Sequence, residues 1–150
     1  MTRVDFYVLE ELAPEAVERF ICRLVGRAWR EGNEVFVQVA DRPQAERIDD
    51  LLWTFQDISF VPHGICGETE GDPPVRIGLP GAAPHTADLL VNLGEEVPPR
   101  FAEFERVLEL VPPEPARRDL ARARYRYYQE RGYPLNTHHI TAAMARDTKR

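Results

Sequence analysis

The sequence predicts an α/β fold in which a mostly parallel β-sheet is flanked by helices. Segments with strand patterns alternate along the chain with segments of helical periodicity, and this alternation is typical of parallel strands joined by crossover helices. The expected strand at 88–93 contains an unbroken apolar run at 89–91, as expected of a strand that is covered on both faces. A length of 150 residues suits one domain with one substantial core.

The first half of the chain reads as two strand-helix units. Its strands are rich in aromatic and β-branched residues, and its helices carry apolar residues at the spacing that lines one helical face. Gly32 ends the first helix, whereas Asp41 caps the start of the second helix and Pro43 lies in its first turn. The expected elements are a strand at 4–10, a helix at 14–30, a strand at 34–40 and a helix at 41–55.

The second half contains three further strands and a long basic helix. Proline clusters separate these elements as punctuation and do not mark a domain linker. The link between the first two of these strands is short, so their relative direction stays open. The expected elements are strands at 75–79, 88–93 and 106–111, one or two helical turns at 98–105, and the helix that follows Pro115 and ends near Gly132.

The composition indicates a protein without a membrane segment. No apolar run approaches the roughly 20 residues that span a bilayer, and the start of the chain lacks the pattern of a signal peptide, so we expect a cytoplasmic protein. Cys22, beside the apolar stripe of the first helix, and Cys66 form no CxxC pair. This spacing argues for reduced thiols and against a disulfide or a zinc site.

A phosphate-binding loop is missing from the sequence. There is no GxxxxGK[ST] motif and no GxGxxG motif. The first strand leads into LEELAPEA (9–16), which places carboxylates where backbone amides would have to meet an anion. We therefore expect neither ATP nor a dinucleotide as a cofactor.

A histidine and a cysteine near the middle of the chain are the candidates for catalysis. His63 and Cys66 could serve as base and nucleophile, with Asp57 or Glu68 orienting the imidazole. Their spacing matches no nucleophile elbow and no HExxH motif. We therefore expect a structural His63, with its ring packed after Pro62 and hydrogen-bonded to loop backbone.

Two adjacent histidines lie close to the end of the chain. On a helix, His138 and His139 would point about 100° apart, which makes them a poor pair of metal ligands. We interpret them as part of a solvated tail, and the sequence indicates no metal site.

Aromatic residues gather around the loop that follows the second helix. Trp53, Phe55, Phe60 and Val61 must either cover the core or present an apolar patch. Aromatic residues with little charge between them are also the usual composition of the centre of a protein interface. Both interpretations stay open at this level.

The last long helix carries the most unusual charge. Between Ala116 and Arg131, six arginines stand against one aspartate and one glutamate, a local charge of +4, which leaves about −10 on the rest of a chain with a net charge of −6. An acidic body argues against generic nucleic-acid binding. The arginines form either a solvated face or a receptor for carboxylates or phosphates.

The helical spacing assigns these residues to two faces. Arg118, Arg122 and Arg126 are four apart and stack along one face, with Tyr125 beside them. The residues expected to turn toward the sheet are Leu120, Ala123, Tyr127 and Tyr128.

Several stretches together resemble the chi subunit of bacterial DNA polymerase III. They are FYVLE near the start, DDLLWTFQDISFVPHGICGE, the strand DLLVNL, and ARARYRYYQERGYPLNT following VLELVPPE. The similarity runs in order over about residues 4–137, and the combination of LLW, SFVPHG, RYRYY and GYPLNT is specific. It implies one domain at 1–137, with 138–150 as an extension of unknown role.

The resemblance implies a noncatalytic subunit of the clamp-loader assembly with a nucleotide-binding-like fold that lacks the phosphate loop. Family members bind the acidic C-terminal tail of single-stranded DNA-binding protein and, through another surface, the psi subunit; a helicase that uses the same surface is the alternative partner. By position, Trp53 and Phe60 should face psi. The tail-binding residues should be Val111, Arg118, Arg122, Tyr125 and Arg126, with Tyr133 and Leu135 closing the pocket.

Two other functions compete with this adaptor. One is a small hydrolase or transferase that uses His63. The other is direct binding of single-stranded DNA by the arginines and tyrosines of the last helix, against which the acidic body and the lack of a long basic groove argue.

Overall fold

The computed structural model describes residues 1–54, 60–85 and 87–147. Phe55 and Asp57 lie outside the described residues. The described elements are β1 (Arg3–Leu9), α1 (Pro14–Arg30), β2 (Val35–Gln38), α2 (Arg42–Thr54), β3 (His63–Ile65), β4 (Val75–Gly78), β5 (Leu89–Asn92), the 3₁₀ turn η1 (Phe101–Glu103), β6 (Arg106–Val111), α3 (Pro115–Glu130), β7 (Leu135–Ile140) and α4 (Ala142–Asp147).

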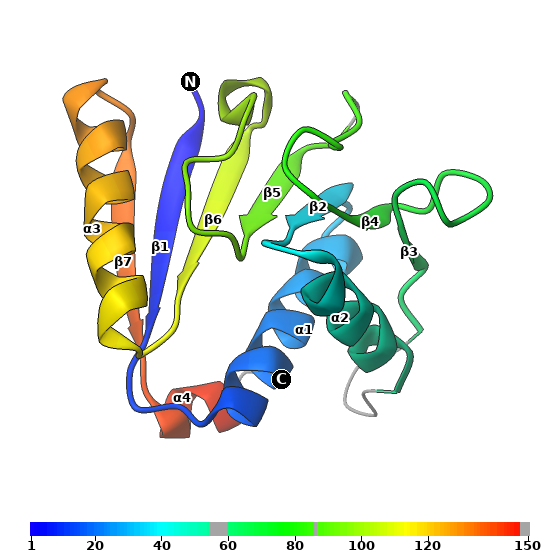
Figure 1. Cartoon of the computed structure of the whole chain (residues 1–150), viewed down its shortest axis with the longest axis horizontal. Helices are drawn as coiled ribbons and strands as arrows, with labels where there is room; N and C mark the ends of the chain where they lie inside the picture. Colours follow the sequence, from blue (N-terminus) through cyan, green and yellow to red (C-terminus); the bar gives the residue numbers. More distant parts are fainter. Residues whose placement is uncertain (55–59, 86, 148–150) are drawn as a thin grey trace.

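The strands form one seven-stranded sheet in the order β3-β4-β2-β5-β6-β1-β7 (Figure 1). Every pairing between the described strands is parallel. The relative direction that the sequence left open is therefore decided, because β4 and β5 both run parallel to β2, with Val35 opposite Val75 on one side and Leu89 on the other. The expected α/β class is confirmed.

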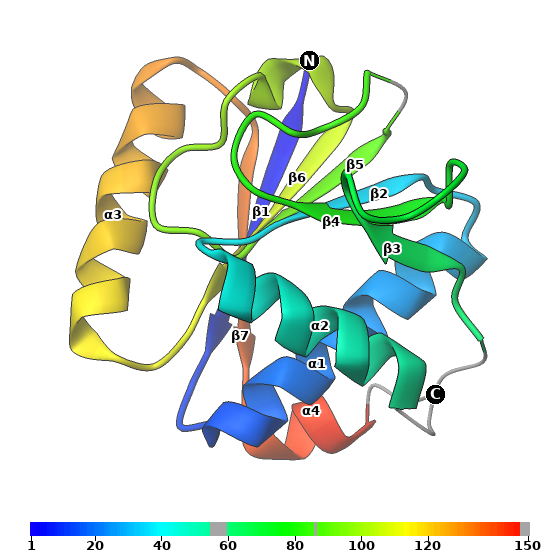
Figure 2. The ribbon, with the colours of Figure 1, turned by 45° about the vertical axis from the view of Figure 1, so that its right-hand side comes forward.

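The helices cover the two faces of the sheet unequally. In Figure 2, α3 lies on one face, and α1, α2 and α4 lie on the other. Each face has its own core, and β6 contributes to both: Leu108 and Leu110 pack toward α1, whereas Val107 and Val111 pack toward α3. Strands of this kind are apolar at successive positions because both faces are buried.

The expected helix boundaries are close to those observed. The apolar stripe of α1 is buried at Phe20, Ile21 and Val25, and Cys22 is buried beside it. At the start of α2, the Asp41 carboxylate accepts a hydrogen bond of 2.9 Å from the backbone N–H of Gln44, as an N-cap does. Gly32 after α1 and Gly132 after α3 both have positive φ, a conformation that costs other residues free energy.

The C-terminal segment is built into the fold, and the histidines expected in a solvated tail lie in strand β7, where both are exposed. β7 pairs with β1 along its whole length, so the domain boundary expected at 137 falls inside this strand. α4 follows at once and lies against the start of α1 (Figure 1), where Ala145 is buried. Neither β7 nor α4 was predicted from the sequence, and β3 lies within the segment that was predicted to be a loop.

The inward face of α3 also differs from the prediction. Tyr128 is buried as predicted and Tyr127 is half-buried, but Leu120 and Ala123 are exposed. Ala121 and Arg124 are buried in their place. The sheet side of this helix is thus partly polar, and a buried arginine replaces the expected apolar contact.

Candidate functional site

A pocket of about 290 Å³ lies between α3 and the carboxyl halves of β1 and β7. The strand register explains its position, because Val8 of β1 lies between Val111 of β6 and His139 of β7. We call it the α3 pocket, and its lining residues are Phe6, Val8, Glu10, Val111, Arg118, Ala121, Arg122, Tyr125, Thr137 and His139.

The floor of the α3 pocket is apolar. Phe6 and Val8 alternate on the α3 face of β1, as period-two geometry requires, and Val111 joins them from β6. Tyr125 packs its ring on Phe6 with 5.3 Å between centroids. An apolar side chain entering here would meet aromatic and aliphatic surface that the fold already holds in place.

The helix side of the α3 pocket is basic. Arg118 and Arg122 lie one turn apart on α3, and the exposed Arg122 pairs with Asp119 at 2.7 Å. The Nε of Arg118 is buried and has no hydrogen-bond partner among the described residues. The side chains of Arg118 and Arg122 thus bring two guanidinium groups to one side of the pocket, and guanidinium groups suit carboxylates and phosphates.

Four of the seven tail-binding residues expected from the resemblance meet in this pocket: Val111, Arg118, Arg122 and Tyr125. The other three do not line it. Their positions are as follows: Arg126 is exposed one turn farther along α3, Tyr133 packs against Phe101 at 5.1 Å between centroids, and Leu135 pairs with Val4 at the opposite end of β1.

Sequence reasoning missed the strand side of the pocket, which Glu10, Thr137 and His139 form. The segment 135–140 is polar at most positions, and an edge strand of this kind has little of the apolar alternation by which strands are recognised.

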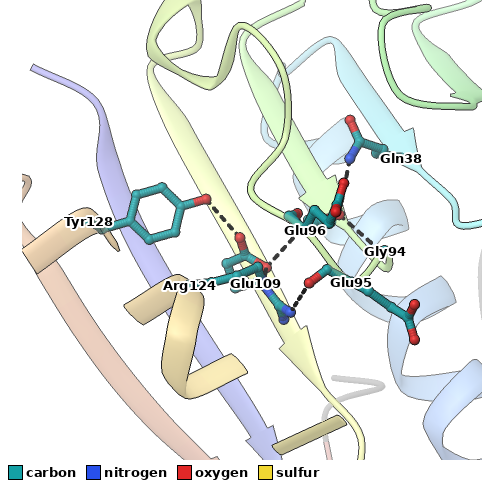
Figure 3. Close-up of polar contacts among 8 residues, drawn as sticks. Gln38, Gly94, Glu95, Glu96, Glu109, Arg124 and Tyr128 are labelled. Atoms are coloured by element: carbon teal, nitrogen blue, oxygen red, sulfur yellow. Dashed lines mark hydrogen bonds and ion pairs between the residues drawn. The ribbon is translucent and has the colours of Figure 1, made fainter. Parts of the chain in front are cut away.

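A buried polar network fixes α3 over the sheet (Figure 3). Glu109 of β6 is fully buried, and its carboxylate accepts hydrogen bonds from Arg124 Nε at 2.9 Å and Tyr128 Oη at 2.7 Å. Burial, reinforced by the adjacent Glu109 carboxylate, raises the pKa of Tyr128, so its hydroxyl stays protonated and donates. The helix that carries the pocket arginines is thereby held to β6 by charge-assisted contacts.

The same network reaches the neighbouring strands. Asn92 of β5 donates to Glu109 at 2.9 Å and accepts from Gln38 of β2 at 3.3 Å. Arg124 also donates to the backbone carbonyl of Glu95 at 2.9 Å. The side chains of Glu109, Arg124, Tyr128, Asn92 and Gln38 are thus joined by hydrogen bonds. A connected network of this kind fixes the position of α3 on the sheet.

Two aromatic side chains form a second surface at the end of α2. Trp53 is 56% exposed and Phe60 is 63% exposed, and their rings lie 5.5 Å apart. We call them the aromatic patch. Val61 is fully buried, so the two interpretations of this segment divide: Val61 covers the core, whereas Trp53 and Phe60 face solvent.

The buried ring of His63 packs against Trp53 of the aromatic patch. Its ring lies 4.6 Å from that of Trp53, Nδ1 is 2.7 Å from the carbonyl oxygen of Val61, and Nε2 is 3.1 Å from that of Asp49. Both ring nitrogens thus lie within hydrogen-bond distance of backbone carbonyl oxygens, and Nε2 also lies 3.3 Å from the Asp49 carboxylate. The expected contact of its ring with loop backbone is confirmed at Val61, and the structural role stays a prediction.

The pairing of His63 with Cys66 has no geometric support. His63 faces α2, whereas Cys66 packs with the cluster on the α3 face, and burial raises the pKa of the Cys66 thiol. Glu68 pairs with Arg42 at 2.5 Å. Asp57, the other acid considered, lies outside the described residues.

Among the described residues, no group of three or more His, Cys, Asp and Glu side chains is arranged to hold a metal ion. None of the helices within 1–54, 60–85 and 87–147 has the length and apolarity to cross a membrane.

Comparison with known proteins gives a consistent result. Residues 1–136 match the family model described as DNA polymerase III chi subunit, HolC. DNA polymerase III subunit chi of Pseudomonas aeruginosa is 43% identical over 140 residues, which cover 93% of this chain and 98% of that protein. The subunits of the same name from Haemophilus influenzae and Escherichia coli are each 34% identical, over 91% of this chain and 96% and 97% of theirs. With a match of this extent, the chain belongs to the DNA polymerase III chi subunits, a family of noncatalytic accessory subunits of a replicative polymerase.

Proposed function

We propose that this chi subunit is an adaptor that binds the acidic C-terminal tail of single-stranded DNA-binding protein in the α3 pocket and a psi-like partner at the aromatic patch, within the clamp-loader assembly. One observation carries the first part. The α3 pocket combines an apolar floor with Arg118 and Arg122 on one side, and the buried Nε of Arg118 has no acceptor among the described residues.

The chemistry of an acidic tail fits this arrangement. An aromatic side chain near the end of the tail enters beside Tyr125 and over Val111, and its terminal carboxylate accepts from Arg118 and Arg122. Burying a ring supplies roughly 2–3 kcal/mol, and each charge-assisted hydrogen bond about 1.5–3 kcal/mol. After the costs of association, an affinity of about 1 μM, or roughly −8 kcal/mol, is expected.

The remaining predicted residues act from outside the pocket. Arg126 extends the basic side by one turn and meets the aspartates that precede the end of the tail. Tyr133 packs against Tyr128 at 6.4 Å between centroids and Leu135 belongs to the same core cluster. In this proposal these two side chains hold the C-terminal end of α3 on the sheet.

The aromatic patch suits a protein partner. Exposed aromatic anchors of this kind are common at the centres of interfaces. The partner is psi or, as the alternative, a helicase that uses the same surface, and DNA is reached only through partner proteins. An adaptor with these partners works in the cytoplasm.

Titration of a labelled acidic peptide ending in an aromatic residue tests the proposal. Arg122→Ala should weaken binding about tenfold or more, because a charge-assisted hydrogen bond to a carboxylate contributes about 1.5–3 kcal/mol. Arg131→Ala is the matched control, since its guanidinium stacks on Tyr127 at 3.5 Å, outside the pocket. Raising the salt concentration should weaken binding of the peptide to the unmodified protein.

A peptide with an amidated C-terminus completes the experiment. It should bind more weakly than the free acid, because the terminal carboxylate is the group that Arg118 and Arg122 receive. Equal losses for Arg122→Ala and Arg131→Ala, or no loss on amidation, would show a diffuse basic surface. Tight binding of a single-stranded oligonucleotide that both variants abolish would favour direct DNA binding.

A further inference from the structure

The strand side of the α3 pocket carries an acidic group that faces the same space as the arginines. Glu10 lies directly after β1, and its backbone N–H donates to the carbonyl oxygen of Ile140 at 3.0 Å. Its carboxylate, about 41% exposed, lines the pocket together with Arg118 and Arg122. A pocket that receives an acidic chain therefore has a negative charge on one of its two sides.

His139 holds this carboxylate. The imidazole Nδ1 lies 3.0 Å from Oε1 of Glu10, and since a carboxylate only accepts hydrogen bonds, Nδ1 is the donor. The register of β7 places His139 opposite Val8 on the pocket face, whereas the adjacent His138 points to the other face and contacts Asp5 at 3.1 Å. The contact thus ties the Glu10 side chain to the edge strand, across the pocket from α3.

We infer that Glu10 and His139 are specificity-determining residues of the α3 pocket, which make it select the direction and the charge pattern of the bound acidic chain. The inference rests on the proposed function of the pocket. Glu10 repels carboxylates from the strand side, so the terminal carboxylate and the aspartates lie toward Arg118 and Arg122. His139 keeps the Glu10 carboxylate at the β7 rim and so limits this repulsion.

The charge pattern of the ligand gives the first test. Glu10→Gln removes the repulsion, so it should strengthen binding of an acidic peptide with a C-terminal aromatic residue by about twofold to fivefold, the range for exposed charge pairs. A peptide in which the aspartates are replaced by asparagine should gain less than the acidic one. An unchanged or weaker affinity of Glu10→Gln for the acidic peptide would overturn the inference.

A double-mutant cycle gives the second test. His139→Ala should weaken acidic-peptide binding about twofold to fivefold when Glu10 is present. In the Glu10→Gln background the same change should have little effect, because no charge remains to be held. Equal losses in both backgrounds would assign His139 a merely structural role and overturn the inference.

Controls separate this inference from the proposed function. His138→Ala, on the opposite face of β7, should leave peptide affinity unchanged once circular dichroism has shown the fold to be intact. If Arg122→Ala weakens binding and Glu10→Gln brings no selective gain, only the inference fails. If Arg122→Ala has no effect, the pocket is not the tail site and both fail.

Discussion

The hydroxyl of Tyr128 lies 2.7 Å from the Glu109 carboxylate in the core between α3 and the sheet. Tyr128 is fully buried, and its ring also packs against Phe6 and Phe101. The tyrosine thus supplies both apolar contact and a hydrogen bond to the buried carboxyl group of Glu109, whose pKa is raised by burial. We expect the packing of α3 on the sheet to depend on the ring contacts and on this hydrogen bond.

Removing only this hydroxyl should destabilise the protein. Tyr128→Phe keeps the ring but leaves one oxygen of Glu109 without its donor, so the free energy of unfolding should fall by about 1–3 kcal/mol. Urea denaturation measures the change. Tyr127→Phe, on the same helix and at a half-buried position, is the control. It should lower the free energy of unfolding by less than about 0.5 kcal/mol. Equal effects of the two changes would contradict the role of the buried hydrogen bond.

Asp5 makes the stability of the fold sensitive to acid. Burial acts to raise the pKa of this carboxyl, but hydrogen bonds from Arg106 at 2.7 Å and His138 at 3.1 Å outweigh it, and the pKa lies below its ordinary value. Ionised Asp5 therefore stabilises the fold above the pKa of an unfolded aspartate, about 4. That contribution is lost as the pH falls through the lower pKa of the folded state.

The variant Asp5→Asn tests this linkage. At pH 7 it should be less stable than the unmodified protein, and the difference should narrow as the pH is lowered from about 4 toward 2. Chemical denaturation at a series of pH values measures both curves. Asp50→Asn, an exposed position, should run parallel to the unmodified protein. A constant difference across this range would rule out Asp5 as the acid-sensitive group.

Truncating the aromatic patch should separate binding from stability. Trp53→Ala and Phe60→Ala remove mostly exposed surface, so circular dichroism and the unfolding midpoint should change little. Binding of the psi-like partner should weaken by about 2 kcal/mol for each, as for interface anchors. Leu79→Ala, an exposed apolar residue elsewhere, is the control and should not weaken it. A variant that unfolds would show that its residue belongs to the core.

His63 should matter for stability and not for catalysis. His63→Ala leaves the carbonyl groups of Val61 and Asp49 without the imidazole and removes the support under Trp53, so unfolding should become easier by about 1–3 kcal/mol. His85→Ala, whose side chain is 81% exposed, should have little effect. Thermal denaturation of both variants decides the point, and an unchanged stability of His63→Ala would contradict the structural role.

Much of the element order followed from local pattern. The helix predicted at 14–30 coincides with α1, because its apolar stripe, its proline at the start and the glycine beyond its end all agree. The structural role of His63 could also be predicted, since no motif gave it a chemical partner. The edge strand β7 could not, because most of its residues are polar and β1, its partner among the described strands, is more than 100 residues away.

Periodicity determined which residues of a helix share a face, and only packing decided which face turns inward. Arg118 and Arg122 were placed together by their spacing alone. That Arg124 is buried followed from Glu109 in β6, a partner that no local pattern could assign. The α3 pocket joins β1, β6, α3 and β7 because parallel pairing brings their ends together. By itself the sequence determined the chemistry of the helix side, and the tertiary structure decided that Glu10 and His139 stand opposite it, since contacts between distant segments depend on how the sheet is assembled.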